Sequence, residues 1–233
     1  MPPAGDEPGG TVLTLVSSAD DLAVLAERAA RHQATCLVRL VAAGGVVAAF
    51  VPTPFGCLGL RAVRLRVPAE TDVVVEAVGL AARARTGGAV LTLPPALPPL
   101  LWTHQLPPRS GWTVAGTLTA ADVAARVAAD TEEFRRRAAQ VDVGRAAASA
   151  VEAVARELWS RPLAADHAAG LAHAAVYLGF VAEPGPAGSP GGGPGSATEE
   201  PVTLRSAGLW RRLDTPLGVT LARASEPLGL LVG

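Results

Sequence analysis

The apolar and polar positions near the start of the chain predict a short strand followed by an amphipathic helix. The run TVLTLV at residues 11–16 is typical of a β-strand. Ser18, followed three residues later by Asp21, forms a capping-box pattern that predicts a helix to about Arg31. The predicted apolar face of this helix, with spacings of three and four, consists of Leu22, Leu25, Ala26 and Ala29.

Three apolar segments follow this helix and predict an antiparallel meander. They are Cys36 to Val41, Val46 to Val51 and Leu60 to Val67. A Gly-Gly pair and a TPFG loop separate them, at spacings typical of hairpin connections. The third segment alternates apolar residues with arginines, which indicates a strand with one buried face. A further strand at 72–75 and a second helix at 76–85 complete this part of the prediction.

A proline-rich segment separates the two halves of the chain. Six prolines lie between residues 86 and 112, and the segment carries no charge before Arg109. Because proline fixes φ and lacks an amide donor, the segment cannot be the interior of a helix or of a central strand. Trp102 and Trp112 need partners for their rings and indole N–H groups. We therefore predict an ordered loop that is pinned at a junction between two lobes.

Helical periodicity dominates after the proline-rich segment. A cap at Thr119 and Asp122 precedes a predicted helix to about Ala139, and two more helices are expected at about 145–159 and 163–178. Short strands are then predicted at 202–205, 209–213 and 219–223. Three helices followed by a β-hairpin is the order of elements in a winged-helix module, so this half is predicted to be winged-helix-like.

Together these patterns predict an α+β fold in two domains. An N-terminal mixed α/β domain with the meander is expected over 11–115, after a disordered tail at 1–10. A helical domain with a C-terminal β-hairpin is expected over 116–233. Within it, residues 183–201 contain six Gly and five Pro, a composition too flexible to pack, and are expected to be a disordered insertion.

Composition limits the classes of partner. The hydrophobic fraction of 49% supports a real core, although only 4% of residues are aromatic. The sequence contains no lysine, which excludes Schiff-base chemistry and a phosphate-loop lysine. The net charge is −1 and neither half is strongly basic, so arginine abundance alone does not indicate nucleic-acid binding.

Other features indicate a cytoplasmic protein without a membrane contact. Cys36 and Cys57 lie in apolar surroundings without CxxC spacing, and are expected to be small buried hydrophobes. The N-terminal residues do not form a signal-peptide pattern. The charge-free window at 40–60 has the length of a membrane span, but glycine and proline divide it into hairpin-length pieces.

Two groups of residues are candidates for contact with a partner. The first lies in the proline-rich segment and is framed by large aromatic rings: Trp102, His104, Arg109 and Trp112. These residues can bind a ligand or another protein, or the tryptophans can simply plug a domain junction. The second group lies near the C-terminal hairpin and is the candidate nucleic-acid surface: Arg205, Arg211, Arg212 and Arg223.

The remaining motifs give no catalytic assignment. On the predicted third helix, His167 is expected to be buried and hydrogen-bonded and His173 to lie at the surface. No histidine pair has metal-binding spacing. Dinucleotide-binding, phosphate-loop, nucleophile-elbow and zinc-protease motifs are absent from the sequence. We therefore predict no catalytic residue, no metal and no cofactor.

Four segments of the chain resemble a family of uncharacterised proteins from high-G+C Gram-positive, actinobacterial bacteria. They are TPFGCLGLRAV (53–63), LWTHQLPPRSGW (101–112), LGFV (178–181) and LWRRLDTPLGVTLAR (209–223). The resemblance implies an N-terminal α/β unit, a junction built on the tryptophans and an LPP motif, and a helical half closed by a hairpin that contains a tryptophan. It implies no activity and transfers no catalytic residue.

These observations favour a non-enzymatic binding or assembly module that acts through protein–protein contact or homodimerisation. One alternative is a winged-helix-like transcriptional regulator that touches DNA. A second alternative is a small enzyme or ligand receptor with a site at the domain junction, using His104 and Arg109.

Overall fold

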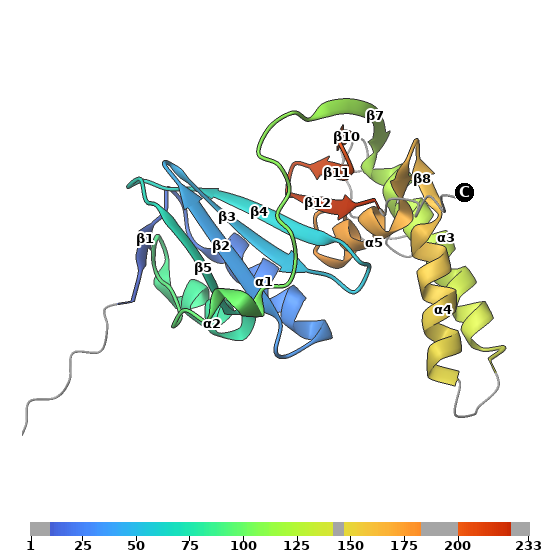
Figure 1. Ribbon diagram of the computed structural model, residues 1–233, viewed down its shortest axis with the longest axis horizontal. Coiled ribbons are helices and arrows are strands. Elements are labelled where there is room, and N and C mark those ends of the chain that lie inside the picture. Colours follow the sequence, from blue (N-terminus) through green and yellow to red (C-terminus); the bar gives the residue numbers. More distant parts are fainter. Residues whose placement is uncertain (1–9, 142–146, 183–199, 225–233) are drawn as a thin grey trace, which may run out of the picture. The chain divides into compact units, whose positions relative to one another are not determined.

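The computed structural model describes residues 10–141, 147–182 and 200–224 (Figure 1). The chain folds into two compact units. Unit 1 contains residues 10–52 and 60–104, and unit 2 contains residues 53–59 and the described residues from 105 onward. Of the predicted disordered tail (1–10) and the predicted Gly/Pro insertion (183–201), residues 1–9 and 183–199 lie outside the described residues. The end of the predicted insertion is wrong, because a strand begins at Pro201.

Unit 1 combines an antiparallel sheet with two helices. Its elements are β1 (Val12–Thr14), α1 (Asp20–His32), β2 (Leu37–Ala43), β3 (Val46–Pro52), β4 (Leu58–Arg64), β5 (Thr71–Glu76), α2 (Ala77–Gly87), β6 (Val90–Thr92) and the short 3-10 helix η1 (Pro99–Leu101). The strands follow the order β5-β2-β3-β4, and β2 pairs antiparallel with both β5 and β3. The predicted meander is therefore confirmed. β1 and β6 form a separate antiparallel pair.

Alternation along the strands builds the core of unit 1. In β2, the side chains of Val38, Leu40 and Ala42 are buried while the intervening residues are half-exposed. The predicted apolar face of α1 is confirmed, because its four residues are at most 2% exposed. α1 packs against α2 and β3. No helix in the described parts of the chain has both the length and the apolar character to cross a membrane.

The two predicted capping boxes have opposite outcomes. At the start of α3 (Ala120–Ala138), the amide of Asp122 donates to Thr119 Oγ1 at 3.0 Å and the amide of Thr119 donates to Asp122 Oδ2 at 3.0 Å, so this capping box is confirmed. The box at Ser18 is wrong. Ala19 is the N-cap of α1 and is fully buried, and the Ser18 hydroxyl donates to Asp20 Oδ2 instead. Packing of Ala19 sets this helix start.

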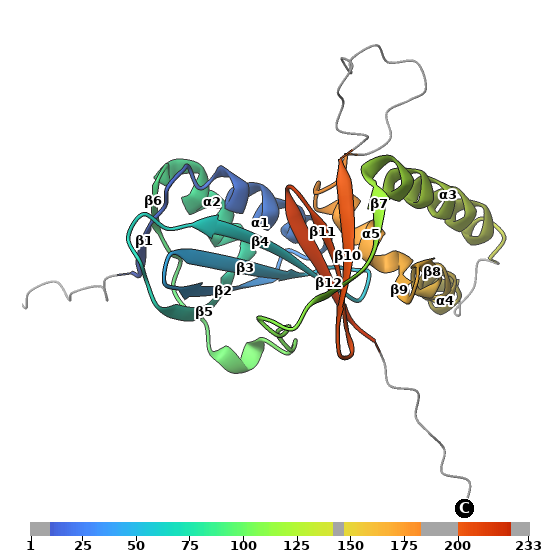
Figure 2. The ribbon, with the colours of Figure 1, turned by 90° about the horizontal axis from the view of Figure 1, so that it is seen from above.

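Unit 2 combines helices with antiparallel strands (Figure 2). Besides α3, its elements are β7 (Thr113–Thr119), α4 (Ala147–Ser160), β8 (Pro162–Ala164), β9 (His167–Ala168), α5 (Ala169–Tyr177), β10 (Pro201–Ala207), β11 (Trp210–Thr215) and β12 (Gly218–Arg223). The strands follow the order β12-β11-β10-β7, with antiparallel pairing throughout. The α+β class is thus confirmed for the chain.

The winged-helix-like description of the C-terminal half is not confirmed. The C-terminal strands do not form an isolated hairpin, because β10 pairs on its other side with β7, which the hydrophobic pattern did not predict. The third predicted helix also starts later. Residues 162–168 form the small β8–β9 ladder, whose turn passes through Ala165 at φ 49°, and the helix begins only at Ala169. A left-handed residue ends any continuous helix there.

The helix α5 forms the centre of unit 2. Every residue from Ala169 to Val176 is buried, and α5 packs against α3, α4 and β12. The hydroxyl of Thr220 on β12 donates to the carbonyl of Leu171 at 2.9 Å. Gly170 lets the loop at 53–59 approach closely, since a Cβ at this position would lie 2.9 Å from the carbonyl oxygen of Phe55. The helix therefore holds Phe55 in a fixed position beside its own side chains.

Candidate functional site

The four candidate residues of the proline-rich segment are divided between the two units. In unit 1, the rings of Trp102 and His104 have centroids 5.3 Å apart, and the buried Trp102 Nε1 has no hydrogen-bond partner in the described part of the chain. In unit 2, Trp112 Nε1 donates to the carbonyl of Pro108 at 3.0 Å. Arg109 is exposed. Each tryptophan therefore has neighbours within its own unit.

The four hairpin arginines do not form one exposed basic surface. Arg205 and Arg212 both bind Asp214, at 2.8 and 2.5 Å, and the Arg212 guanidinium also lies 5.4 Å from the centroid of the Trp112 ring. Arg211 and Arg212 are successive residues of β11, so their side chains point to opposite faces of the strand. It pairs with Asp166. Arg223 is exposed at the end of β12.

The site that the geometry favours is a pocket within unit 2, which we call the aromatic pocket. It has a volume of about 270 Å³. Its lining residues are Phe55, Val127, Asp130, Thr131, Phe134, Trp159, His173, Val176 and Tyr177. The chain contains only four Trp, four Phe and one Tyr, and four of these nine aromatic residues line this one pocket.

Phe55 organises the aromatic wall of the pocket. Its ring meets Trp159 edge to face at 4.9 Å and 80°, and Tyr177 edge to face at 5.8 Å and 72°. These are the favourable geometries for aromatic pairs, each contributing about 0.5–1.5 kcal/mol beyond area burial. The loop that carries Phe55 is closed by Thr53, whose amide and hydroxyl both donate to the carbonyl of Cys57 at 3.0 and 2.8 Å. Contacts within the protein itself therefore hold this aromatic wall in place.

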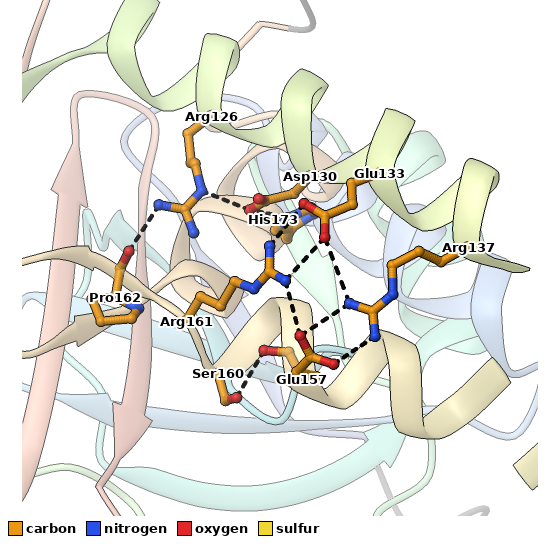
Figure 3. A network of polar contacts seen from close by, with 9 residues as sticks. All are labelled: Arg126, Asp130, Glu133, Arg137, Glu157, Ser160, Arg161, Pro162 and His173. Atoms are coloured by element: carbon orange, nitrogen blue, oxygen red, sulfur yellow. Dashed lines mark hydrogen bonds and ion pairs between the residues drawn. The ribbon is translucent and has the colours of Figure 1, made fainter. Parts of the chain in front are cut away.

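The floor of the pocket contains the buried Asp130 and His173, and the half-buried Arg126 binds Asp130 from beside the pocket (Figure 3). Arg126 Nε donates to Asp130 Oδ2 at 2.8 Å, and His173 Nε2 lies 3.3 Å from the same oxygen. Since a carboxylate only accepts, the histidine carries its proton on Nε2. Burial lowers the pKa of His173 below its ordinary value of 6.5, although the neighbouring Asp130 opposes this shift. The floor is thus one ion pair and one neutral imidazole, with no net charge.

A second ionic network fixes the helices that carry the pocket (Figure 3). Arg161 donates to both carboxylate oxygens of Glu133 on α3, at 2.8 and 2.9 Å, and to Glu157 on α4 at 2.8 Å. Arg137 donates to both oxygens of Glu157, at 2.9 and 2.6 Å. These two guanidinium groups lower the pKa of Glu157 to about 2. The network joins α3, which carries Phe134, to α4, which carries Trp159.

The hydroxyl of Thr131 and the thiol of Cys57 are both turned toward main-chain carbonyls. The Thr131 hydroxyl donates to the carbonyl of Val127 at 2.7 Å, within its own helix. The nearby Cys57 thiol is turned to the carbonyl of Gly170 at 3.4 Å, and burial raises its pKa to about 12. Neither group is a nucleophile activated by His173. The described residues also contain no cluster of three or more His, Cys, Asp or Glu side chains that could hold a metal.

The sequence patterns did not predict this pocket. His173 was expected at the surface, and this expectation is wrong, since His173 is only 7% exposed. A helix that is buried on every side has no polar face, so periodicity cannot assign its residues to inside or outside. The one available signal was the i, i+4 pair of His173 and Tyr177 on α5, which places both side chains on one face.

Two family models match the chain, and both describe domains of unknown function. The domain of unknown function DUF8010 matches residues 11–104, and the domain of unknown function DUF8185 matches residues 107–227. No curated protein matches the sequence. Among solved structures, the chain is similar to the DNA polymerase sliding clamp from Pseudomonas aeruginosa, with 10% identity and a TM-score of 0.47. That match covers 93% of this chain and 65% of the clamp, so the chain spans less than two thirds of its length.

The DUF8185 match covers more than half of the chain and includes all the elements that surround the aromatic pocket, apart from the loop at 53–59. The predicted resemblance to a family without an assigned function is confirmed to this extent, and the actinobacterial origin remains a prediction. The chain belongs to the family of the domain of unknown function DUF8185.

Proposed function

We propose that this chain is a non-enzymatic binding module, and that its aromatic pocket holds an aromatic side chain of a partner polypeptide. The observation that carries the proposal is the convergence of four of the nine aromatic residues of the chain on one pocket of unit 2. In a chain built mainly from small aliphatic residues, this concentration marks one place for recognition. Aromatic residues are enriched at the centres of protein interfaces, where they form the contacts that dominate affinity.

The size of the pocket supports a side chain as the occupant. Pockets for small molecules and cofactors occupy about 300–1,000 Å³. At about 270 Å³, the aromatic pocket lies just below this range. It offers room for one planar ring with its attached carbon. A ring carried by a polypeptide would fill the pocket while its backbone remained outside.

The exposure of the walls supports binding of an apolar ring. Phe55, Phe134, Trp159 and Tyr177 are all half-buried, while Val127 and Val176 are buried beneath them. The aromatic rings therefore keep apolar surface in contact with water. Covering that surface releases about 25 cal/mol for each Å² of apolar area. An aromatic occupant would gain ring–ring contacts in addition.

Selection of peptides from a random display library on the full chain tests this proposal. We expect enriched peptides to share one aromatic position, because that residue supplies the contact with the pocket. Phe134→Ala removes one wall and should weaken peptide binding at least tenfold, a loss typical of a truncated interface anchor. The matched control is Arg135→Ala, whose side chain is 72% exposed and paired only at the surface with Glu132. It should leave peptide binding unchanged.

Two outcomes would reject the proposal. One is a set of enriched peptides without a shared aromatic position. The other is equal binding of the enriched peptides to the wild-type chain and to Phe134→Ala, provided that the two proteins unfold at similar urea concentrations. Either result would place the recognition surface outside the aromatic pocket.

A further inference from the structure

The hydrogen bonds of Asp130 leave one acceptor open at the floor of the aromatic pocket. Both of its contacts, from Arg126 Nε at 2.8 Å and from His173 Nε2 at 3.3 Å, converge on Oδ2. Among the described residues, no donor binds Oδ1. Oδ1 is not fully covered by protein atoms, so solvent can still reach it. Since Asp130 lines the pocket, an occupant would lie against this carboxylate.

We infer that the ring bound in the aromatic pocket carries a hydrogen-bond donor, and that this donor binds Asp130 Oδ1. The inference rests on the proposed function and specifies the chemistry of the partner. An occupant would keep solvent away from Oδ1. A purely hydrocarbon ring would then leave a carboxylate oxygen without a hydrogen bond, which is costly. An N–H or O–H group on the ring supplies that hydrogen bond.

The charges at the floor favour a neutral donor over a cation. Aromatic walls around a carboxylate also fit an ammonium group, which would bind through cation–π contacts. Here, however, the Asp130 carboxylate is already paired with the Arg126 guanidinium, and the floor has no net negative charge. A cation at Oδ1 would enter the field of Arg126, which repels it. A neutral indole N–H or phenol O–H meets the same acceptor without that repulsion.

Tryptophan, tyrosine and neutral histidine combine an aromatic ring with such a donor, and of these tryptophan and tyrosine have the larger apolar body for the aromatic walls. Both present an apolar body to surrounding rings and a polar edge to a single acceptor, which is the arrangement of walls and floor in this pocket. We therefore assign the occupant to a tryptophan or tyrosine side chain of a partner polypeptide. Phenylalanine and leucine fit the walls, but leave Oδ1 without a donor.

A matched pair of ligands tests the inference on the full chain. N-acetyltryptophanamide carries the indole donor, and the amide of N-acetylbenzothienylalanine replaces the N–H with sulfur at nearly the same size. Binding is followed by NMR from the methyl signals of Val127 and Val176, which line the pocket. We expect the benzothienyl ligand to bind at least about tenfold more weakly, as is typical when a charged acceptor loses its hydrogen bond.

The outcomes separate this inference from the proposed function. Equal affinities for the two ligands would overturn the donor assignment and leave the pocket as an apolar receptor. Failure of both ligands, and of the tyrosine and phenylalanine analogues, to move the two methyl signals would overturn the proposed function as well. A lysine analogue, N-acetyllysinamide with a trimethylated amine, that binds more tightly than the indole would overturn the choice of a neutral donor.

Discussion

Asp130 and His173 lie 43 residues apart in the chain, yet Oδ2 of the aspartate and Nε2 of the histidine are 3.3 Å apart, and both side chains are more than nine-tenths buried. The contact joins the middle of α3 to the middle of α5. It also forms the floor of the aromatic pocket, where Arg126 neutralises the aspartate. Each of these polar groups is costly to bury alone, so they stabilise unit 2 only as a set.

The stability of the fold should depend on pH through His173. Burial lowers the pKa of His173 below 6.5, so the folded chain favours the neutral ring. The unfolded chain takes up the proton first as the pH falls, and the free energy of unfolding should decrease from about pH 6.5 down to the folded pKa. Urea unfolding between about pH 7.5 and about pH 5.5 measures this decrease. In His173→Gln the decrease should be smaller, and an unchanged slope would contradict the assignment.

Removing the carboxylate of Asp130 should destabilise the chain strongly. Asp130→Ala leaves the buried His173 without its acceptor and the half-buried Arg126 without its ion-pair partner, and we expect a loss of about 2–3 kcal/mol in the free energy of unfolding. The comparison is Glu132→Ala on the same helix, whose side chain is 69% exposed. That substitution should stay within about 0.5 kcal/mol. Equal effects of the two variants in urea unfolding would show that the buried network contributes little.

The two candidate helix caps make a paired prediction. Thr119→Ala removes a complete capping box and should cost about 1 kcal/mol. Ser18→Ala removes a hydroxyl that binds only the Asp20 side chain in an exposed position, and should cost less than about 0.5 kcal/mol. Thermal unfolding of both variants under one set of conditions makes the comparison. A larger loss for Ser18→Ala would mean that α1 is capped at Ser18 after all.

The two cysteines should be unreactive in the folded chain. Both are free and buried, and burial raises the pKa of Cys57 to about 12 and also raises that of Cys36. Because the thiolate is the reactive form, a thiol reagent such as Ellman's reagent should modify both residues only after unfolding. Reaction rates with and without guanidinium chloride test this expectation. Rapid modification of the folded wild-type chain would contradict the burial, and Cys57→Ala would identify the responsible residue.

The sequence patterns predicted the elements whose packing is one-sided. The apolar face of α1, the strand at β2 and the cap of α3 all follow local rules, and each is found in the structure. Local rules failed where burial is complete or weak. α5 is buried on all sides and therefore has no polar face that periodicity could reveal. β7 carries an exposed Val114 and the small Gly116, and therefore lacks the alternation that is typical of a strand.

The aromatic pocket could not be predicted because its residues are distant in the chain. Phe55 comes from a loop of seven residues that joins unit 2, although it lies in the sequence between strands of unit 1. Its neighbours Trp159 and Tyr177 follow more than a hundred residues later. Each aromatic residue alone is typical of a core position. Only the fold shows that four of them share one cavity above a buried ion pair.

The most direct test of the account is a titration of the full chain, with methyl-labelled valine, by N-acetyltryptophanamide. The account predicts saturable shifts of the Val127 and Val176 methyl signals, together with contacts between these methyl groups and the ring protons of the ligand. The buried Val38 of unit 1 serves as an internal control and should not move. Shifts confined to other valines, or no shift of any valine at the solubility limit of the ligand, would contradict an aromatic-binding pocket in unit 2.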